Sequence, residues 1–149
     1  MFKKLIDRDD LKLFCAIIYS VVNNFVPEKE MVVYLDRVFD LSENNFRYQK
    51  SIARFKRVHY AKIPTILEKY EEPEFHRSAI CTSQEIAEIE IPEIHRLLQE
   101  VENLKVYYFV VDLGNSLSEW IIVCEDLELT ITGEPFVSRE FRNLPVGPE

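Results

Sequence analysis

The first 70 residues place apolar side chains at intervals of three or four, which is the spacing of one face of a helix. Asp9 or Asp10 is placed to cap a first helix, and Pro27 suits the first turn of a second. This spacing predicts helices over residues 9–25, 27–39 and 43–60, and Pro64 either ends the third or opens a short helix through Tyr70.

After Lys105 the period of the apolar positions changes to that of β-strands. Two continuous apolar runs and one alternating run are separated by turn residues. The pattern predicts a three-stranded antiparallel meander, with strands over 106–111, 120–124 and 127–131 and turns at 114–116 and at Glu125-Asp126.

The stretch between these two halves fits two descriptions. Residues 76–82 have a strand pattern, but the sequence does not say whether they join the meander. Thr82 and Glu85 have the spacing of a capping box, which favours a short helix after them. Pro92 then opens a clear helix, whose apolar positions are Ile94, Leu97, Leu98, Val101 and Leu104.

We therefore expect one α+β domain over residues 1–149, in which an N-terminal helical half packs on a C-terminal antiparallel meander of at least three strands. A chain of 149 residues fills one hydrophobic core and is short for two. Residues 134–149 are expected to form a loosely held tail, partly anchored by Phe136, Val137 and Phe141.

Composition narrows the class of protein. The chain is 47% hydrophobic and 30% charged, which is typical of a soluble globular domain. Its 3 glycines stand too far apart for a phosphate-binding loop or a dinucleotide fingerprint. Cys15, Cys81 and Cys124 are odd in number and widely spaced, which indicates reduced thiols and a cytoplasmic protein. The apolar run over 13–22 is too short for a membrane span, so it is expected to be a core helix.

Charge is divided unevenly along the chain. Residues 1–41 carry 6 basic and 7 acidic side chains, residues 42–70 carry 7 and 2, and residues 71–149 carry 5 and 17. The formal net charge is -8. An acidic C-terminal half is a candidate surface for a basic protein partner.

The basic stretch within 42–70 has three interpretations. Arg47, Lys50, Arg54 and Arg57 share one outer face of the predicted third helix, with aromatic residues beside them. Such a face binds nucleic acid, pairs with the acidic half of the same chain, or is simply solvated. We expect no nucleic-acid binding, because the acidic remainder of the chain repels a polyanion.

No constellation of residues indicates catalysis. His59, His76 and His95 lack the spacing of metal ligands, and the cysteines lie in apolar runs. Paired carboxylates such as Glu88 with Glu90 are too abundant to single out a site. We therefore expect no enzyme activity, no catalytic residue, no bound metal and no cofactor.

The strand over 106–111 is apolar on both faces. Its two faces are Tyr107, Phe109 and Val111, and Val106, Tyr108 and Val110. Either other parts of the chain cover both faces, or one face meets another protein or a second copy. Trp120 is correspondingly either a core residue or an interface anchor.

Residues 106–133 combine an aromatic strand, a Gly-Asn-Ser turn, a Glu-Trp-Ile-Ile-Val strand and an alternating strand. This segment, 28 of the 149 residues, resembles the C-terminal sheets of small bacterial immunity proteins from polymorphic and contact-dependent growth-inhibition toxin systems. The resemblance implies a cytoplasmic, non-enzymatic protein that neutralises a basic toxin, such as a nuclease, by occluding its active surface.

The expected partner-binding residues lie at the ends and rim of the predicted meander. Acidic side chains there would steer a basic partner into contact, and apolar anchors would slow its release. No membrane contact is expected. The alternative is a structural or adaptor subunit, or a homodimer that pairs through the sheet. The candidate residues for binding the basic partner are Asp112, Glu119, Glu125, Asp126 and Glu128.

Overall fold

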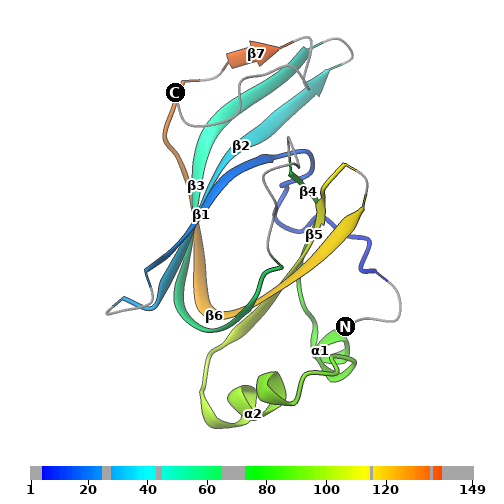
Figure 1. The fold of residues 1–149 in the computed structure, drawn as a ribbon, viewed down its shortest axis with the longest axis vertical. Coiled ribbons are helices and arrows are strands. Elements are labelled where there is room, and N and C mark those ends of the chain that lie inside the picture. Colours follow the sequence, from blue (N-terminus) through cyan, green and yellow to red (C-terminus); the bar gives the residue numbers. More distant parts are fainter. Residues whose placement is uncertain are drawn as a thin grey trace.

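The computed structural model describes residues 5–24, 28–42, 45–64, 73–114, 116–134 and 136–138, and their side chains except those of 39–42, 45–47 and 136–138. Antiparallel strands dominate these residues, and two short helices lie together at one end (Figure 1). In chain order the elements are β1 Ile17–Asn24, β2 Glu30–Ser42, β3 Asn45–Lys62, β4 Glu74–Ile80, α1 Ser83–Ala87, α2 Pro92–Glu100, β5 Lys105–Asp112, β6 Leu117–Ile131 and β7 Phe136–Ser138.

The sheet closes on itself because β2 pairs with both β1 and β3 (Figure 1). Around the resulting barrel the strands follow the order β1-β2-β3-β6-β5-β4, and β4 returns to β1. β7 lies outside this ring, against the first residues of β3. Closure pairs backbone groups that the edges of an open sheet would leave unpaired.

The two longest strands, β3 and β6, bend so that the barrel can close. The register between them shifts between Val58 and Tyr60, and Arg57 beside this bulge has a φ of 54°. A bulge of this kind increases the local twist of a strand. β3 pairs with β2 over residues 45–55 and with β6 over residues 51–62, so the bulge lies in the part that pairs with β6.

The barrel closes at a short seam between β1 and β4. Ile17 and Glu74 form the one register pair between these strands in the described residues. The N-terminal segment, residues 8–16, completes the seam alongside β4. Its backbone hydrogen bonds run from Cys15 N to Phe75 O (2.8 Å), from Phe75 N to Ala16 O (2.9 Å), from Asp10 N to Ser78 O (2.8 Å) and from Ser78 N to Arg8 O (3.1 Å).

The Asp9 carboxylate holds the N-terminal segment in shape. Its Oδ1 accepts hydrogen bonds from Leu13 N (2.9 Å) and Ser78 Oγ (2.8 Å), and its Oδ2 accepts one from Phe14 N (3.1 Å). The Ser78 hydroxyl in turn accepts from Leu11 N (3.1 Å). One side chain thus connects the loop to β4 and turns Leu13 toward the core, where it is buried.

The barrel interior is filled by aromatic and branched side chains. Phe55 meets Phe109 edge to face at 5.8 Å between ring centroids, and Phe75 meets Trp120 at 5.7 Å. These rings are fully buried, and each such pair adds about 1 kcal/mol to the burial of its area. Trp120 is therefore a core residue.

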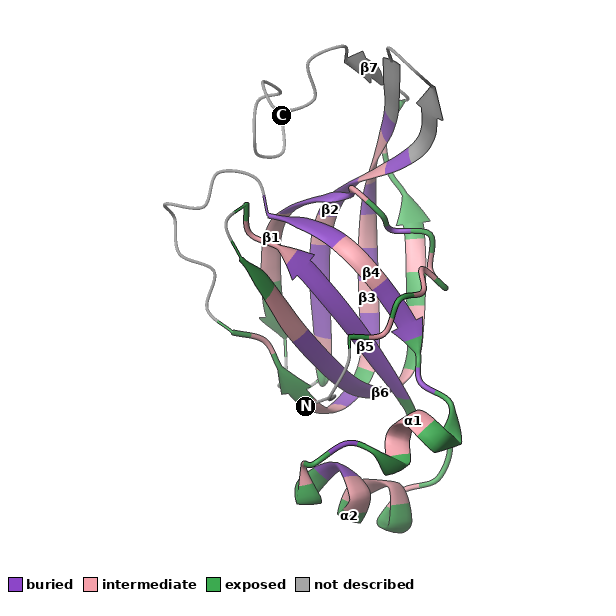
Figure 2. Ribbon diagram, turned by 90° about the vertical axis from the view of Figure 1, so that its right-hand side faces the viewer, coloured by how far each residue is buried: buried purple, intermediate pink, exposed green. Residues whose placement is uncertain are grey.

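A second apolar cluster covers the outer face of β4, β5 and β6. Tyr108, Ile121 and Val123 lie on the face opposite to the barrel interior and pack with Ile89 and Ile94 of the segment that contains α1 and α2. Both helices lie at one end of the barrel (Figure 2). The other face of the same strands lines the barrel interior. Both apolar faces of β5 are thus covered within the chain, which was one of the two alternatives left open by the sequence.

The predicted N-terminal helical half is wrong, because residues predicted as three helices form β1, β2 and β3. The run over 13–22 is apolar except for Ser20, so it satisfies helical and strand spacing almost equally. In β2 the inward residues Met31, Val33 and Leu35 alternate with outward ones. In β3 the inward positions include Gln49 and Ser51, whose polarity hides the period of two. The α+β class with a helical half is therefore replaced by a β-barrel.

The predicted meander also needs correction. Glu125 and Asp126 form no turn, because β6 runs unbroken from Leu117 to Ile131. Its second half pairs with β3 and its first half with β5. Two charged residues in a row look like a turn when the partner strands on each side are unknown.

Several local predictions agree with the structure. Thr82 and Glu85 form a capping box, with Glu85 N donating to Thr82 Oγ1 (3.2 Å) and Thr82 N to Glu85 Oε1 (2.9 Å). α2 begins at Pro92, and β5 covers the predicted strand. Residues 74–80 join the sheet as β4. Residues 65–72 and 139–149, which include most of the short helix predicted after Pro64 and most of the predicted tail, lie outside the described residues.

No helix in the described part of the chain is long and apolar enough to cross a membrane.

Replacing Asp9 tests the seam. We expect Asp9→Ala to lower the free energy of unfolding by about 2 kcal/mol, because it removes a charged acceptor used by three donors. Urea unfolding of the full chain measures this. The control is Asp7→Ala, which removes a carboxylate that is 79% exposed and paired with Arg77. That change should cost under about 0.5 kcal/mol, and equal effects of the two changes would contradict the role given to Asp9.

Candidate functional site

Three of the five predicted partner-binding residues are paired with cations of the barrel wall. Arg57 Nε lies 3.0 Å from Glu125 Oε2, and Lys56 Nζ lies 3.0 Å from Glu128 Oε2. Asp126 Oδ1 lies 3.8 Å from Lys105 Nζ. Such exposed pairs add little stability, but they cancel the negative potential that a basic partner would sense.

The other two predicted residues have local structural contacts. Glu119 Oε2 accepts a hydrogen bond from Tyr108 Oη (2.7 Å). Burial, followed by this hydrogen bond, raises the pKa of Tyr108 well above its usual range. Asp112 Oδ1 accepts from Gly114 N (2.7 Å) in the β5–β6 turn, where Gly114 has a φ of 95°. The structure therefore does not gather the five residues into one acidic surface.

The predicted basic face is not a helix face, because its residues lie on β3. Lys50 Nζ lies 3.8 Å from Asp36 Oδ1 and 4.8 Å from the centroid of the Tyr19 ring. Arg54 Nη1 lies 2.9 Å from Glu30 Oε1. Lys50 and Arg54 thus pair with carboxylates of β2, which lies outside the acidic C-terminal half, whereas Arg57 pairs with Glu125 of that half. The predicted pairing with the acidic half therefore holds for Arg57 and not for Lys50 or Arg54. The side chain of Arg47 lies outside the described residues.

Asp36 is the most buried of these carboxylates, with 1% of its surface exposed. Tyr19 Oη donates a hydrogen bond to its Oδ2. Burial raises the pKa of Asp36, and the charge of Lys50 opposes that shift. Asp36 thus connects β1, β2 and β3 on the outside of the barrel.

The largest group of exposed carboxylates that form no ion pair with a described residue lies instead on the helical segment, which we define as residues 82–104. It contains six glutamates and one arginine. Glu85 pairs with Arg8, but the other five are exposed and form no ion pair with a described residue. The segment lies at one end of the molecule, away from β7 (Figures 1 and 2). The five unpaired residues are Glu88, Glu90, Glu93, Glu100 and Glu102.

In the sequence, the signal for this surface is the excess of six glutamates over one arginine within residues 82–104. The helical segment packs on the barrel through apolar side chains, namely Ile86, Ile89, Ile94 and Leu98. Among the described residues only Arg8 forms an ion pair with it, whereas β6 runs beside the basic β3. The negative potential of the helical segment is therefore largely retained. That of acidic strand residues beside a basic strand is offset by the neighbouring cations.

An open cavity of about 550 Å³ lies at the start of α2. Ile91 and Pro92 form part of its apolar lining, and Glu90 and Arg96 contribute charge. His95 Nε2 donates to Ile89 O at 2.6 Å, which fixes the imidazole beside the cavity. The helical segment therefore combines unpaired glutamates with an apolar recess.

The remaining candidate groups offer little chemistry. No group of three or more His, Cys, Asp and Glu side chains able to hold a metal ion occurs among the described residues. Burial raises the pKa of both Cys81 and Cys124 to about 12, which opposes a nucleophilic thiolate at neutral pH.

The Arg8–Glu85 pair joins the N-terminal segment to α1. Arg8 Nη1 lies 2.6 Å from Glu85 Oε2 and Nη2 lies 2.8 Å from Oε1, a bidentate arrangement. The hydrogen bonds from Arg8 lower the pKa of Glu85 from 4.5 to about 2. A carboxyl with a lowered folded-state pKa stabilises the fold above its unfolded pKa, and this contribution disappears as the pH falls through the folded value.

Removing Arg8 tests this linkage. We expect Arg8→Gln to lower the urea midpoint at neutral pH and to weaken its decrease between about pH 4.5 and pH 2, because Glu85 then titrates near its ordinary pKa. Urea unfolding across that pH range measures both effects. Arg96→Gln is the control, since Arg96 forms no ion pair with a described residue. An acid dependence unchanged in Arg8→Gln would contradict the assignment.

Comparison of the chain with protein-family models, with characterised proteins and with solved structures gave no match.

Proposed function

We propose that this chain is a non-enzymatic cytoplasmic binding protein that captures a basic protein partner on its helical segment. One observation carries the proposal, namely the contrast in how acidic residues are paired. Glu125, Asp126 and Glu128 on the barrel wall lie beside cations, whereas five exposed glutamates of residues 82–104 form no ion pair with a described residue. An unpaired cluster on a protein with a net charge of -8 attracts a positively charged surface.

The helical segment supports both stages of capture. Its glutamates accelerate the encounter with a basic surface, an effect that weakens with salt. The recess beside Ile91 and Pro92 offers an apolar pocket for an anchor side chain of the partner, which slows dissociation. Because α1 and α2 pack on the barrel through buried isoleucines, the surface is presented on a rigid support.

The most specific form of the proposal is an immunity-type inhibitor of a basic toxin, whose active surface the helical segment would occlude. The identification of the partner as a toxin comes from the resemblance of residues 106–133 to immunity proteins. The location of the binding surface comes from the distribution of charge. The homodimer alternative was motivated by apolar faces on both sides of β5. Those faces pack on other parts of the same chain, so this motivation is lost.

Matched neutralising variants test the surface. If a large secreted protein with a variable C-terminal domain is encoded beside this gene, that domain is the partner to use. We expect the wild-type chain to protect cells that co-express this domain. We expect Glu88→Gln/Glu93→Gln/Glu100→Gln to slow association about tenfold at low salt, because three unpaired charges are lost. Association rates at two salt concentrations measure this.

The control is Glu125→Gln/Asp126→Asn/Glu128→Gln, which removes the same charge from paired positions. It should change the association rate less than about twofold. A larger effect of the control triple than of the helical triple would contradict the assigned surface. Failure of the wild-type chain to protect cells would contradict the immunity function.

Nucleic-acid binding provides a separate check. We expect no measurable binding of generic single-stranded RNA at physiological salt, because Arg54 and Arg57 are paired and the chain is acidic. Fluorescence anisotropy with labelled RNA measures this. Salt-sensitive binding that is lost in Arg54→Glu/Arg57→Glu would show that β3, and not the helical segment, is the binding surface.

A further inference from the structure

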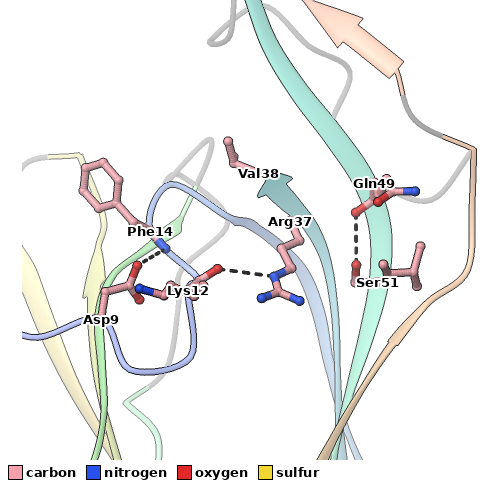
Figure 3. Close-up of a pocket in the computed structure, with 8 residues that line it drawn as sticks. Asp9, Lys12, Phe14, Arg37, Val38, Gln49 and Ser51 are labelled. Atoms are coloured by element: carbon pink, nitrogen blue, oxygen red, sulfur yellow. Dashed lines mark hydrogen bonds between the residues drawn. The ribbon is translucent and has the colours of Figure 1, made fainter. Parts of the chain in front are cut away.

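A second cavity lies at the mouth of the barrel, and none of its lining residues belongs to the helical segment. It is about 420 Å³ in volume and opens between the N-terminal segment and β2, β3 and β6 (Figure 3). Cavities of this size hold small organic molecules. Lys12 and Arg37 supply positive charge to its lining, and Gln49 supplies an amide.

Arg37 is held by the N-terminal segment with part of its guanidinium left over. Nε donates to Lys12 O and Nη2 donates to Leu11 O, each at 3.3 Å. These two bonds occupy the side edge of the guanidinium. The end edge, formed by Nη1 and the second N–H of Nη2, has no hydrogen-bond partner among the described residues. That edge has the geometry that binds a carboxylate with two parallel hydrogen bonds.

One negative charge faces two positive charges in the lining of the mouth. Asp9 also lines the cavity, and hydrogen bonds from Leu13 N, Phe14 N and Ser78 Oγ orient its carboxylate toward the N-terminal segment and β4. Neither Lys12 nor Arg37 forms an ion pair with any residue that the structure describes. The neighbouring carboxylate on β2, Asp36, belongs to the outer face and pairs with Lys50.

Two apolar side chains are exposed at the same mouth. Phe14 is 37% exposed and Ile131 is 54% exposed, and both line the cavity. The Phe14 ring is kept in position by the His76 ring, 5.9 Å away between centroids, and by the Arg77 guanidinium, 5.5 Å from its centroid. Among the described residues the mouth thus offers apolar walls next to two cations and one carboxylate, an excess of positive charge.

We propose that the barrel mouth binds a small organic anion that carries a carboxylate on a short apolar chain. The carboxylate meets the end edge of Arg37, with Lys12 adding attraction and Gln49 a further donor. The apolar chain lies between Phe14 and Ile131. This site shares no residue with the helical segment, so the inference stands independently of the proposed function.

The test is a titration of the full chain with three small probes, followed by two-dimensional NMR of the backbone amides. Hexanoate carries both features, hexanol lacks the charge and acetate lacks the chain. We expect hexanoate to bind with a Kd of about 1 mM, at least roughly tenfold tighter than either other probe. The shifted amides should lie in residues 9–14 and around Arg37, Gln49 and Ile131.

Arg37 is not replaced, because it also orders the N-terminal segment through its hydrogen bonds to Leu11 O and Lys12 O. Ile131→Glu tests the site without that side effect. The change places a carboxylate at the mouth and should weaken hexanoate at least about tenfold, whereas Ile131→Gln should weaken it under about threefold. Equal binding of hexanol and hexanoate, equal binding of acetate and hexanoate, or unchanged binding to Ile131→Glu would each overturn the proposal. So would the absence of amide shifts at the mouth with all three probes.

Discussion

Closure of the barrel at the β1–β4 seam is the constraint on which the rest of the structure depends. These two strands share one register pair, Ile17 with Glu74, so strand pairing alone connects them weakly. The N-terminal segment supplies the remaining backbone hydrogen bonds along β4, and Asp9 fixes its path. The segment closes the seam, sends Leu13 into the core and carries the carbonyls that hold Arg37 at the barrel mouth.

Closure also decides what must lie outside the barrel. The interior takes one face of β4, β5 and β6, and their other face remains apolar, with Tyr108, Ile121 and Val123. The helical segment covers this outer face with Ile89 and Ile94, and consequently turns its glutamates to solvent. Its exposed acidic surface and its buried isoleucines are therefore two sides of one amphipathic element.

Charge follows the same topology. β3 lies between β2 and β6, and its cations meet carboxylates on both neighbours, such as Glu30 and Glu128. Opposite charges on adjacent strands lie close enough to pair. In the helical segment, Glu85 pairs with Arg8, and the other glutamates form no ion pair with a described residue. Their negative potential is therefore not offset by a neighbouring cation. The candidate binding surface is thus the acidic region that folding leaves uncompensated.

Local features could be predicted from the sequence because they depend on neighbours in the chain. The Thr82–Glu85 capping box, the start of α2 at Pro92 and the β5 strand are of this kind. The identity of β1, β2 and β3 depended on tertiary structure, because a run with apolar residues on both faces, or a strand with inward Gln49 and Ser51, carries no clear period. The same limit applied to the site. Sequence alone showed that the C-terminal half is acidic, whereas only the pairing of β3 with β6 decided that Glu125 and Glu128 are neutralised and that the helical glutamates are not.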